Sequence, residues 1–211
     1  HVAWSDAEAF AVIRQYHVGL AWMAEKLGGP IYAEEPVFVR GDYTLAQTMD
    51  FATARNGWTL PKAIFETLAR HGLRAQPAPV PREIWIIMVE GAGAYAGGDG
   101  KEADFARWVP SDVDFAFVGD AVLSPWLSAA GFGPNTCPTT IFKGYYTPAE
   151  NVQYCTVDAQ TGAFLHELGH AAGCVHLEKT DDLMDEWWKW PDVALLPPTI
   201  KQWKESGFVG G

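Results

Sequence analysis

The stretch FLHELGHAAGCVHLEKTDDLMDEWW, residues 164–188, decides which fold we expect for this chain. It holds three of the six histidines, His166, His170 and His176, together with Glu167. On a helix, residues four apart lie on the same face, so the rings of His166 and His170 can point at one position while Glu167 projects beside them. The spacing therefore predicts a helix that carries two imidazole ligands for one metal ion.

The predicted helix has recognisable ends. Asp158 or Thr161 can cap its start, because short polar side chains accept hydrogen bonds from the free N–H groups of the first turn. Gly173 can end it, because glycine readily adopts the left-handed backbone that often follows a helix. A sharp turn at Gly173 would return His176, three residues later, to the same metal position as a third ligand.

The expected ligand set defines the chemistry. Three neutral imidazoles leave the charge of a zinc ion undiminished and one coordination position open, which distinguishes a catalytic site from a closed structural one. Zinc in such a site lowers the pKa of a bound water from about 15.7 toward about 7 and polarises a carbonyl group. Glu167 would accept the proton of that water and later give it to the leaving amine. Hydrolysis of a peptide bond suits this arrangement best.

The pattern His-Glu-x-x-His-x-x-Gly-x-x-His at residues 166–176 resembles the zinc motif of the metzincin clan of metallopeptidases. By this resemblance Glu167 is the general base, and Met184 is similar to the methionine of the metzincin Met-turn, an apolar floor under the metal. The implied zinc ligands are His166, His170 and His176. Two alternatives stay open: the histidines are ordinary core or surface residues, or they bind zinc in a protein that catalyses nothing.

The resemblance also implies an α+β fold: a mixed, twisted sheet with backing helices, an active-site helix, and a small C-terminal subdomain that ends in a helix. Residues 197–207, with Pro198 near the start and Gly207 after the end, suit that last helix. Some metzincins carry a tyrosine two residues after the Met-turn methionine, but here that residue is Glu186. A tyrosine ligand is therefore not expected.

We divide the chain into two regions on this basis. Residues 75–211 are expected to form the catalytic region, with an upper part that ends at residue 173 and a lower part over residues 174–211. We expect residues 1–74 to be mostly helical. Three interpretations of this region stay open: an integral part of the fold, a retained pro-segment or a recognition module. In this region Ser5 and Glu8 form a capping box for a helix that Gly28 ends.

Outside the motif, hydrophobic patterns and turn residues predict further elements. Helices are expected at 43–55 and 61–71, and strands at 36–41, 83–91, 112–120 and 151–157. The glycine-rich residues 91–100 are expected to form an irregular loop. Asp99, Glu102 and Asp104 in and after this loop are a weak calcium candidate, because their spacing fits no EF-hand.

Aromatic and acidic residues near Met184 bear on the substrate. By the resemblance, Trp187 and Trp188 form a wall of the pocket for the residue that follows the scissile bond, and a large apolar side chain is expected there. The alternative is that these residues and Trp190 pack the lower subdomain. Nearby acids either favour basic substrates, orient the histidines or are simply solvated; they are Asp181, Asp182, Asp185 and Glu186.

The three cysteines allow one disulfide. We expect Cys137 to pair with Cys155, because both flank a loop-like stretch while Cys174 lies inside the histidine motif. Three reduced thiols in a cytosolic protein are the alternative. A disulfide would suit a secreted or extracytoplasmic protein, since oxidising compartments preserve such bonds.

Composition narrows the classes of partner. Hydrophobic residues make up 48% of the 211 residues, which is enough for a folded core, and the formal net charge of −11 disfavours nucleic acid. Apolar stretches such as residues 84–89 are far shorter than the roughly 20 residues of a membrane helix. The sequence therefore predicts a zinc endopeptidase acting on protein or peptide substrates. A peptidase restricted to cell-wall peptides or glycoproteins and a non-catalytic zinc-stabilised binding protein are the rival interpretations.

Overall fold

The computed structural model describes residues 4–34, 36–53, 59–73, 83–92, 96–98, 113–140 and 152–209. These residues form helices around one small sheet, a mixed α and β architecture as expected. The elements in chain order are α1 (Asp6–Leu27), α2 (Leu45–Thr53), α3 (Thr59–Arg70), β1 (Glu83–Met88), β2 (Ala96–Gly98), β3 (Val113–Val118), α4 (Asp120–Ala129), α5 (Cys137–Thr140), η1 (Val152–Tyr154), α7 (Val157–Ala171), α8 (Leu183–Glu186), η2 (Trp187–Lys189) and α9 (Pro197–Ser206).

The described strands form a three-stranded sheet in the order β1-β3-β2. β1 pairs with β3 in parallel, with Glu83 opposite Val113, and β2 pairs with β3 antiparallel. Alternate residues of β3 face opposite sides: Phe115 and Phe117 pack with Phe65 of α3, whereas Val118 joins the core around α7. Burial on both faces explains why β1 and β3 read as nearly continuous apolar runs.

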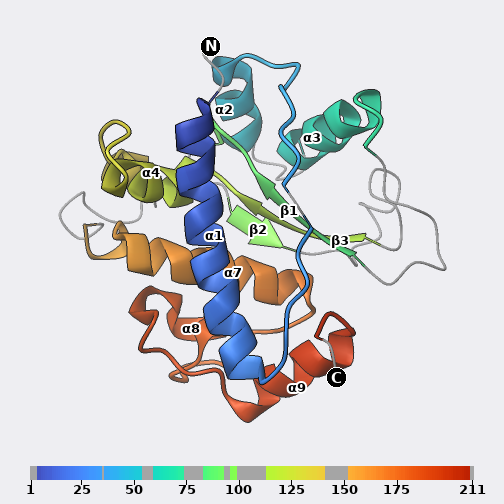
Figure 1. Ribbon diagram of the computed structural model, residues 1–211, viewed down its shortest axis with the longest axis vertical. Coiled ribbons are helices and arrows are strands. Elements are labelled where there is room, and N and C mark those ends of the chain that lie inside the picture. Colours follow the sequence, from blue (N-terminus) through green and yellow to red (C-terminus); the bar gives the residue numbers. More distant parts are fainter. Residues whose placement is uncertain are drawn as a thin grey trace.

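Helix α7 lies at the centre of the molecule. In Figure 1 it runs across the middle, with the sheet on one side and α8 on the other, and it contacts α1, α4 and β3 as well. Its residues Phe164 and Leu165 are fully buried. Two of the three motif histidines, His166 and His170, are therefore carried by a largely buried helix.

The N-terminal helix belongs to this same core. Its Ser5 accepts a hydrogen bond from the Glu8 backbone N–H, and the Glu8 carboxylate accepts one from the Ser5 backbone N–H, which confirms the predicted capping box. Gly28 ends the helix with a φ of 72°, as expected. Gly19 lies against α7, where an added Cβ would stand 3.3 Å from Leu165 and from Thr161. This glycine therefore lies at a tight contact between the two helices.

Three predictions of local structure were wrong. Residues 36–41 form no strand, and Val37 and Phe38 are largely exposed. Residues 151–157 were expected to form a strand, but Val152–Tyr154 form a 3-10 helix and Val157 begins α7. The stretch 91–100, expected to be irregular, contains β2, because β3 offers it a partner for backbone hydrogen bonds. For β2, pairing with a strand distant in the sequence decided the outcome.

The remaining helices agree with the sequence. The predicted helices at 61–71 and 197–207 correspond to α3 and α9, and α2 lies within the range 43–55. Of the described helices, none is both long and apolar enough to cross a bilayer.

Candidate metal centre

The three motif histidines converge on one point. His166 and His170 come from α7, and His176 comes from the loop after it. The Nε2 atom of His170 lies 3.0 Å from that of His166 and 3.1 Å from that of His176. A tetrahedral zinc site with bonds of about 2.0–2.1 Å would place its nitrogen ligands on the order of 3.3 Å apart. The spacing therefore fits a single bound ion.

The other ring nitrogens show which tautomers are present. The Nδ1 atom of His166 lies 3.2 Å from the backbone oxygen of Leu183, and that of His170 lies 3.0 Å from the backbone oxygen of Cys174. A carbonyl oxygen can only accept, so each Nδ1 carries a hydrogen and donates it. The neutral rings then turn the lone pairs of Nε2 toward each other at 3.0 Å. A cation between them would convert this repulsion into coordination.

Protonation of the histidines does not readily relieve this repulsion. The residue His166 is buried, and this burial, together with the neighbouring His170, lowers the pKa of His166 to about 4. Near neutral pH, a second proton on this ring is therefore disfavoured. The three nitrogens fit a divalent ion such as zinc, and imidazole is a suitable ligand for it.

Helix α7 begins and ends where the ligands require it. Thr156 caps it, because its side chain accepts a hydrogen bond from the Ala159 N–H at 3.0 Å; the predicted caps Asp158 and Thr161 lie inside the helix. Gly173 has a φ of 90°, so the chain turns sharply there, as predicted. This turn allows the loop with His176 to fold back onto the helix.

Met184 is completely buried and packs against α7 at Gly169. A Cβ added to Gly169, the residue before His170, would stand 2.5 Å from the Met184 sulfur. Only glycine at this position lets the sulfur approach the helix so closely. Gly169 was not among the predicted site residues. Because a glycine inside a helix costs about 0.5–1 kcal/mol relative to alanine, its presence within the predicted helix is a signal of close packing.

Asp182 fixes the turn that carries Met184. Its fully buried carboxylate accepts hydrogen bonds from the backbone N–H groups of Met184 and Leu196, at 2.9 and 2.7 Å, and from the Thr199 hydroxyl at 3.0 Å. These bonds connect the turn to the start of α9 and hold the Leu183 carbonyl near His166. The alternative that Asp182 is a solvated surface acid is therefore wrong.

Asp185 organises the loop that bears His176. Its carboxylate accepts hydrogen bonds from the backbone N–H and the hydroxyl of Thr180, at 3.1 and 2.6 Å. One oxygen also lies 3.8 Å from Nδ1 of His176. Partial burial opposes ionisation, but the bonds from Thr180 and the nearby His176 hold the pKa of Asp185 below its usual value.

Glu167 follows the first ligand on α7 and keeps some contact with solvent. No hydrogen bond joins its carboxylate to another described residue. Burial of the carboxylate raises the pKa of Glu167 to about 8 in the absence of a metal. A divalent cation nearby would lower this pKa again, because an opposite charge favours the ionised form.

The tryptophans after Met184 separate into two environments. Trp190 is buried and packs against Trp22 of α1 with ring centroids 6.2 Å apart, so for this residue the packing alternative is correct. Trp187 and Trp188 contact Tyr154 with centroids 6.0 and 5.8 Å away. Trp188, which is 36% exposed, lines an open hollow beside the His176 loop; its other lining residues are Lys179, Thr180, Asp181, Asp185 and Glu186. A substrate role for Trp187 and Trp188 stays a prediction.

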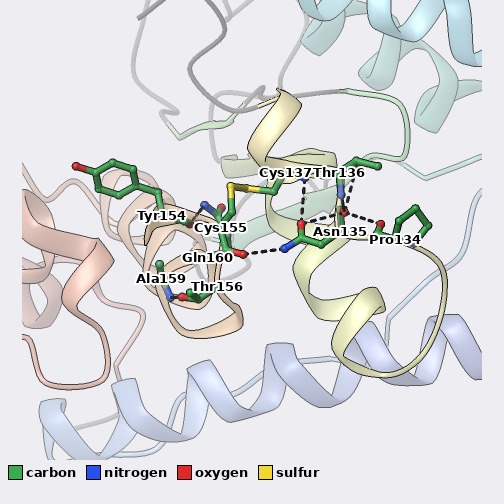
Figure 2. Close-up of a disulfide and its surroundings, with 10 residues drawn as sticks. Pro134, Asn135, Thr136, Cys137, Tyr154, Cys155, Thr156, Ala159 and Gln160 are labelled. Atoms are coloured by element: carbon green, nitrogen blue, oxygen red, sulfur yellow. Dashed lines mark hydrogen bonds between the residues drawn. A yellow bond between two sulfur atoms is a disulfide. The ribbon is translucent and has the colours of Figure 1, made fainter. Parts of the chain in front are cut away.

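The predicted disulfide joins Cys137 to Cys155, with Cα atoms 5.5 Å apart. Figure 2 shows Asn135 beside it, whose amide donates to the Cys155 backbone oxygen at 2.8 Å and accepts from the Cys137 N–H at 3.1 Å. Cys155 directly precedes the helix cap Thr156, so the disulfide anchors the start of α7. The bond thus restrains the helix that carries two of the three clustered histidines.

Cys174 is a free, buried thiol. Burial and the nearby Asp182 raise its pKa to about 12, so it stays protonated and does not act as a thiolate ligand. The calcium candidates Asp99, Glu102 and Asp104 lie outside the described residues.

Comparisons with known proteins add no assignment. No family model matches the chain, and no curated protein sequence or solved structure is significantly similar to it. Any functional conclusion therefore depends on the residues and geometry of the site itself.

Proposed function

We propose that this protein is a zinc-dependent endopeptidase of the metzincin type that hydrolyses peptide bonds. The observation that carries the proposal is the convergence of three imidazole Nε2 atoms, two of them with Nδ1 hydrogens committed to backbone carbonyls. Three neutral protein ligands leave a coordination position for water or substrate. The burial of Met184 against Gly169, the residue before His170, further supports the metzincin type.

Each residue of the site has a part in the proposed reaction. Zinc in this site would supply a water molecule acidic enough to lose a proton near neutral pH and a Lewis acid for the scissile carbonyl. The carboxylate of Glu167 accepts the water proton and then donates it to the nitrogen of the leaving amine. Because no described residue hydrogen-bonds this carboxylate, it is available for both transfers.

Glu167 also favours catalysis over a purely structural zinc site. A structural site closes its fourth position with another protein ligand and has no need of an unpartnered acid beside it. Here the convergent set of possible ligands among the described residues consists of the three histidines alone. We further infer secretion or another extracytoplasmic location, because the disulfide between Cys137 and Cys155 is stable in oxidising compartments.

The decisive variant is Glu167→Gln, which keeps the shape of the side chain but cannot accept a proton. We expect it to bind zinc like the parent and to lose activity on an unfolded protein substrate by about 10²-fold or more, the usual contribution of a general base. Glu205→Gln is the matched control, because Glu205 is an exposed acid on α9. Products are identified by mass spectrometry and zinc by elemental analysis. Equal cleavage rates for Glu167→Gln and the parent would end the proposal.

A further inference from the structure

The third ligand is held differently from the other two. His166 and His170 each donate from Nδ1 to a backbone carbonyl of a packed segment. Among the described residues, no carbonyl oxygen lies within hydrogen-bonding distance of Nδ1 of His176. The His176 side chain is also 57% exposed, on a loop without regular structure. Something other than a backbone acceptor has to orient this ring.

The loop after His176 is tightly bent. Glu178 and Lys179 have φ values of 57° and 61°, in the left-handed region that non-glycine residues rarely adopt. The bend is closed by Asp185, where Oδ2 accepts both hydrogen bonds of Thr180. One carboxylate oxygen therefore holds the backbone of the loop in place from the opposite side.

The second oxygen of the same carboxylate is directed at the ligand. Oδ1 of Asp185 lies 3.8 Å from Nδ1 of His176, and the Asp185 side chain is only 9% exposed. This separation exceeds that of a hydrogen bond, so the attraction acts between the negative charge and the N–H dipole. Ligating histidines commonly present their second nitrogen to a carboxylate or carbonyl, which fixes the ring and increases its basicity.

We propose that Asp185 is the positioning residue of the third metal ligand: Oδ2 fixes the bend at Thr180, and Oδ1 orients His176 so that Nε2 faces the ion. This inference rests on the proposed metal site. It assigns two separate tasks to the two oxygens of one side chain, and substitutions can separate them. An asparagine can keep its amide oxygen toward Thr180, but it then turns an NH2 group toward the Nδ1–H of His176.

The test measures zinc affinity, without reference to catalysis, by competition with a chromogenic chelator. Asp185→Asn should weaken zinc binding about tenfold or more, in the range of about 10–100-fold found for such supporting partners. Asp181→Asn removes the same charge from an exposed neighbour that pairs with Lys189, and it should leave zinc affinity within twofold. Thr180→Val loses the hydroxyl bond but keeps the carboxylate toward His176, so it should lower stability in urea more than zinc affinity.

The cobalt-loaded protein distinguishes a positioning role of Asp185 from a merely structural one, because its visible absorption reports the geometry around the metal. Asp185→Asn should change this spectrum, whereas Thr180→Val should not. If Asp185→Asn does not fold, Asp185→Ser withdraws the carboxylate from His176 and takes its place. Zinc affinity of Asp185→Asn within twofold of a zinc-binding parent would overturn the inference. A parent that binds no zinc would instead refute the metal site.

Discussion

Zinc should stabilise this protein strongly, because the ion would join α7 to the loop that follows it through three ligands held in the folded state. Helix α7 supplies His166 and His170, and the loop from Gly173 onward supplies His176. In the metal-free protein, the Nε2 lone pairs of His166 and His170 face each other at 3.0 Å. Binding removes this repulsion only in the folded state, since the unfolded chain has no such cluster. Zinc binding is therefore linked to folding.

The size of the effect follows from this linkage. At a free zinc concentration about 1,000 times the dissociation constant, the folded state gains about 4 kcal/mol. For a chain of this size, 1 kcal/mol corresponds to roughly 2–4 °C in Tm. Removal of zinc should thus lower Tm by roughly 8–16 °C.

The assay is thermal unfolding followed by circular dichroism, first with free zinc buffered by a chelator and then after dialysis against excess chelator. His176→Ala should lose most of the zinc-dependent shift, because it removes a ligand without removing buried volume. The surface variant Glu205→Gln should keep the full shift. A Tm that differs by less than about 2 °C between zinc-loaded and zinc-free parent protein would refute the assignment of these three histidines as ligands.

The stability of the metal-free protein should also depend on pH. Burial and the neighbouring His170 lower the pKa of His166 to about 4 in the folded protein. In the unfolded chain a histidine has a pKa of about 6.5, so between about pH 4 and about pH 6.5 the unfolded chain binds more protons than the folded protein does. Urea unfolding should show a loss of up to about 3 kcal/mol as pH falls from about 6.5 to 4, and a flat profile would contradict the burial of this ring. Gly162→Ala should destabilise despite better helix propensity, because its Cβ would collide with the Trp187 backbone oxygen. Gly19→Ala, with nearest neighbours at 3.3 Å, should cost less; the opposite order of urea midpoints would show that α7 can move away from Trp187.

Local patterns in the sequence were sufficient to predict several parts of the structure. The Ser5 capping box, the end of α1 at Gly28 and the turn at Gly173 each depend on interactions within a few residues. The positions of His166 and His170 on one helix face follow from the helical period alone. Such features could be predicted because their physical causes are short-range.

Other predictions of secondary structure were wrong because local patterns do not show which distant segments a stretch can pair with. Val37 and Phe38 have the apolar character of a strand, but among the described residues no strand pairs with them, and they are exposed. The segment around Cys155 also looked like a strand, yet the disulfide and the cap at Thr156 make it the entrance to α7. A short apolar segment does not reveal whether a partner is available, and backbone pairing requires one.

The sequence by itself determined which side chains meet in the candidate site: the spacing of His166, His170 and His176 around a glycine turn places three imidazoles together. The tertiary structure alone decided what supports them. Asp182 is a buried anchor and Asp185 holds a bend, although the sequence of the stretch DDLMDE does not distinguish these two acids from their acidic neighbours. The reason is that ligand spacing is set along the chain, whereas burial and hydrogen-bond partners are set by segments such as α9 that fold back from elsewhere.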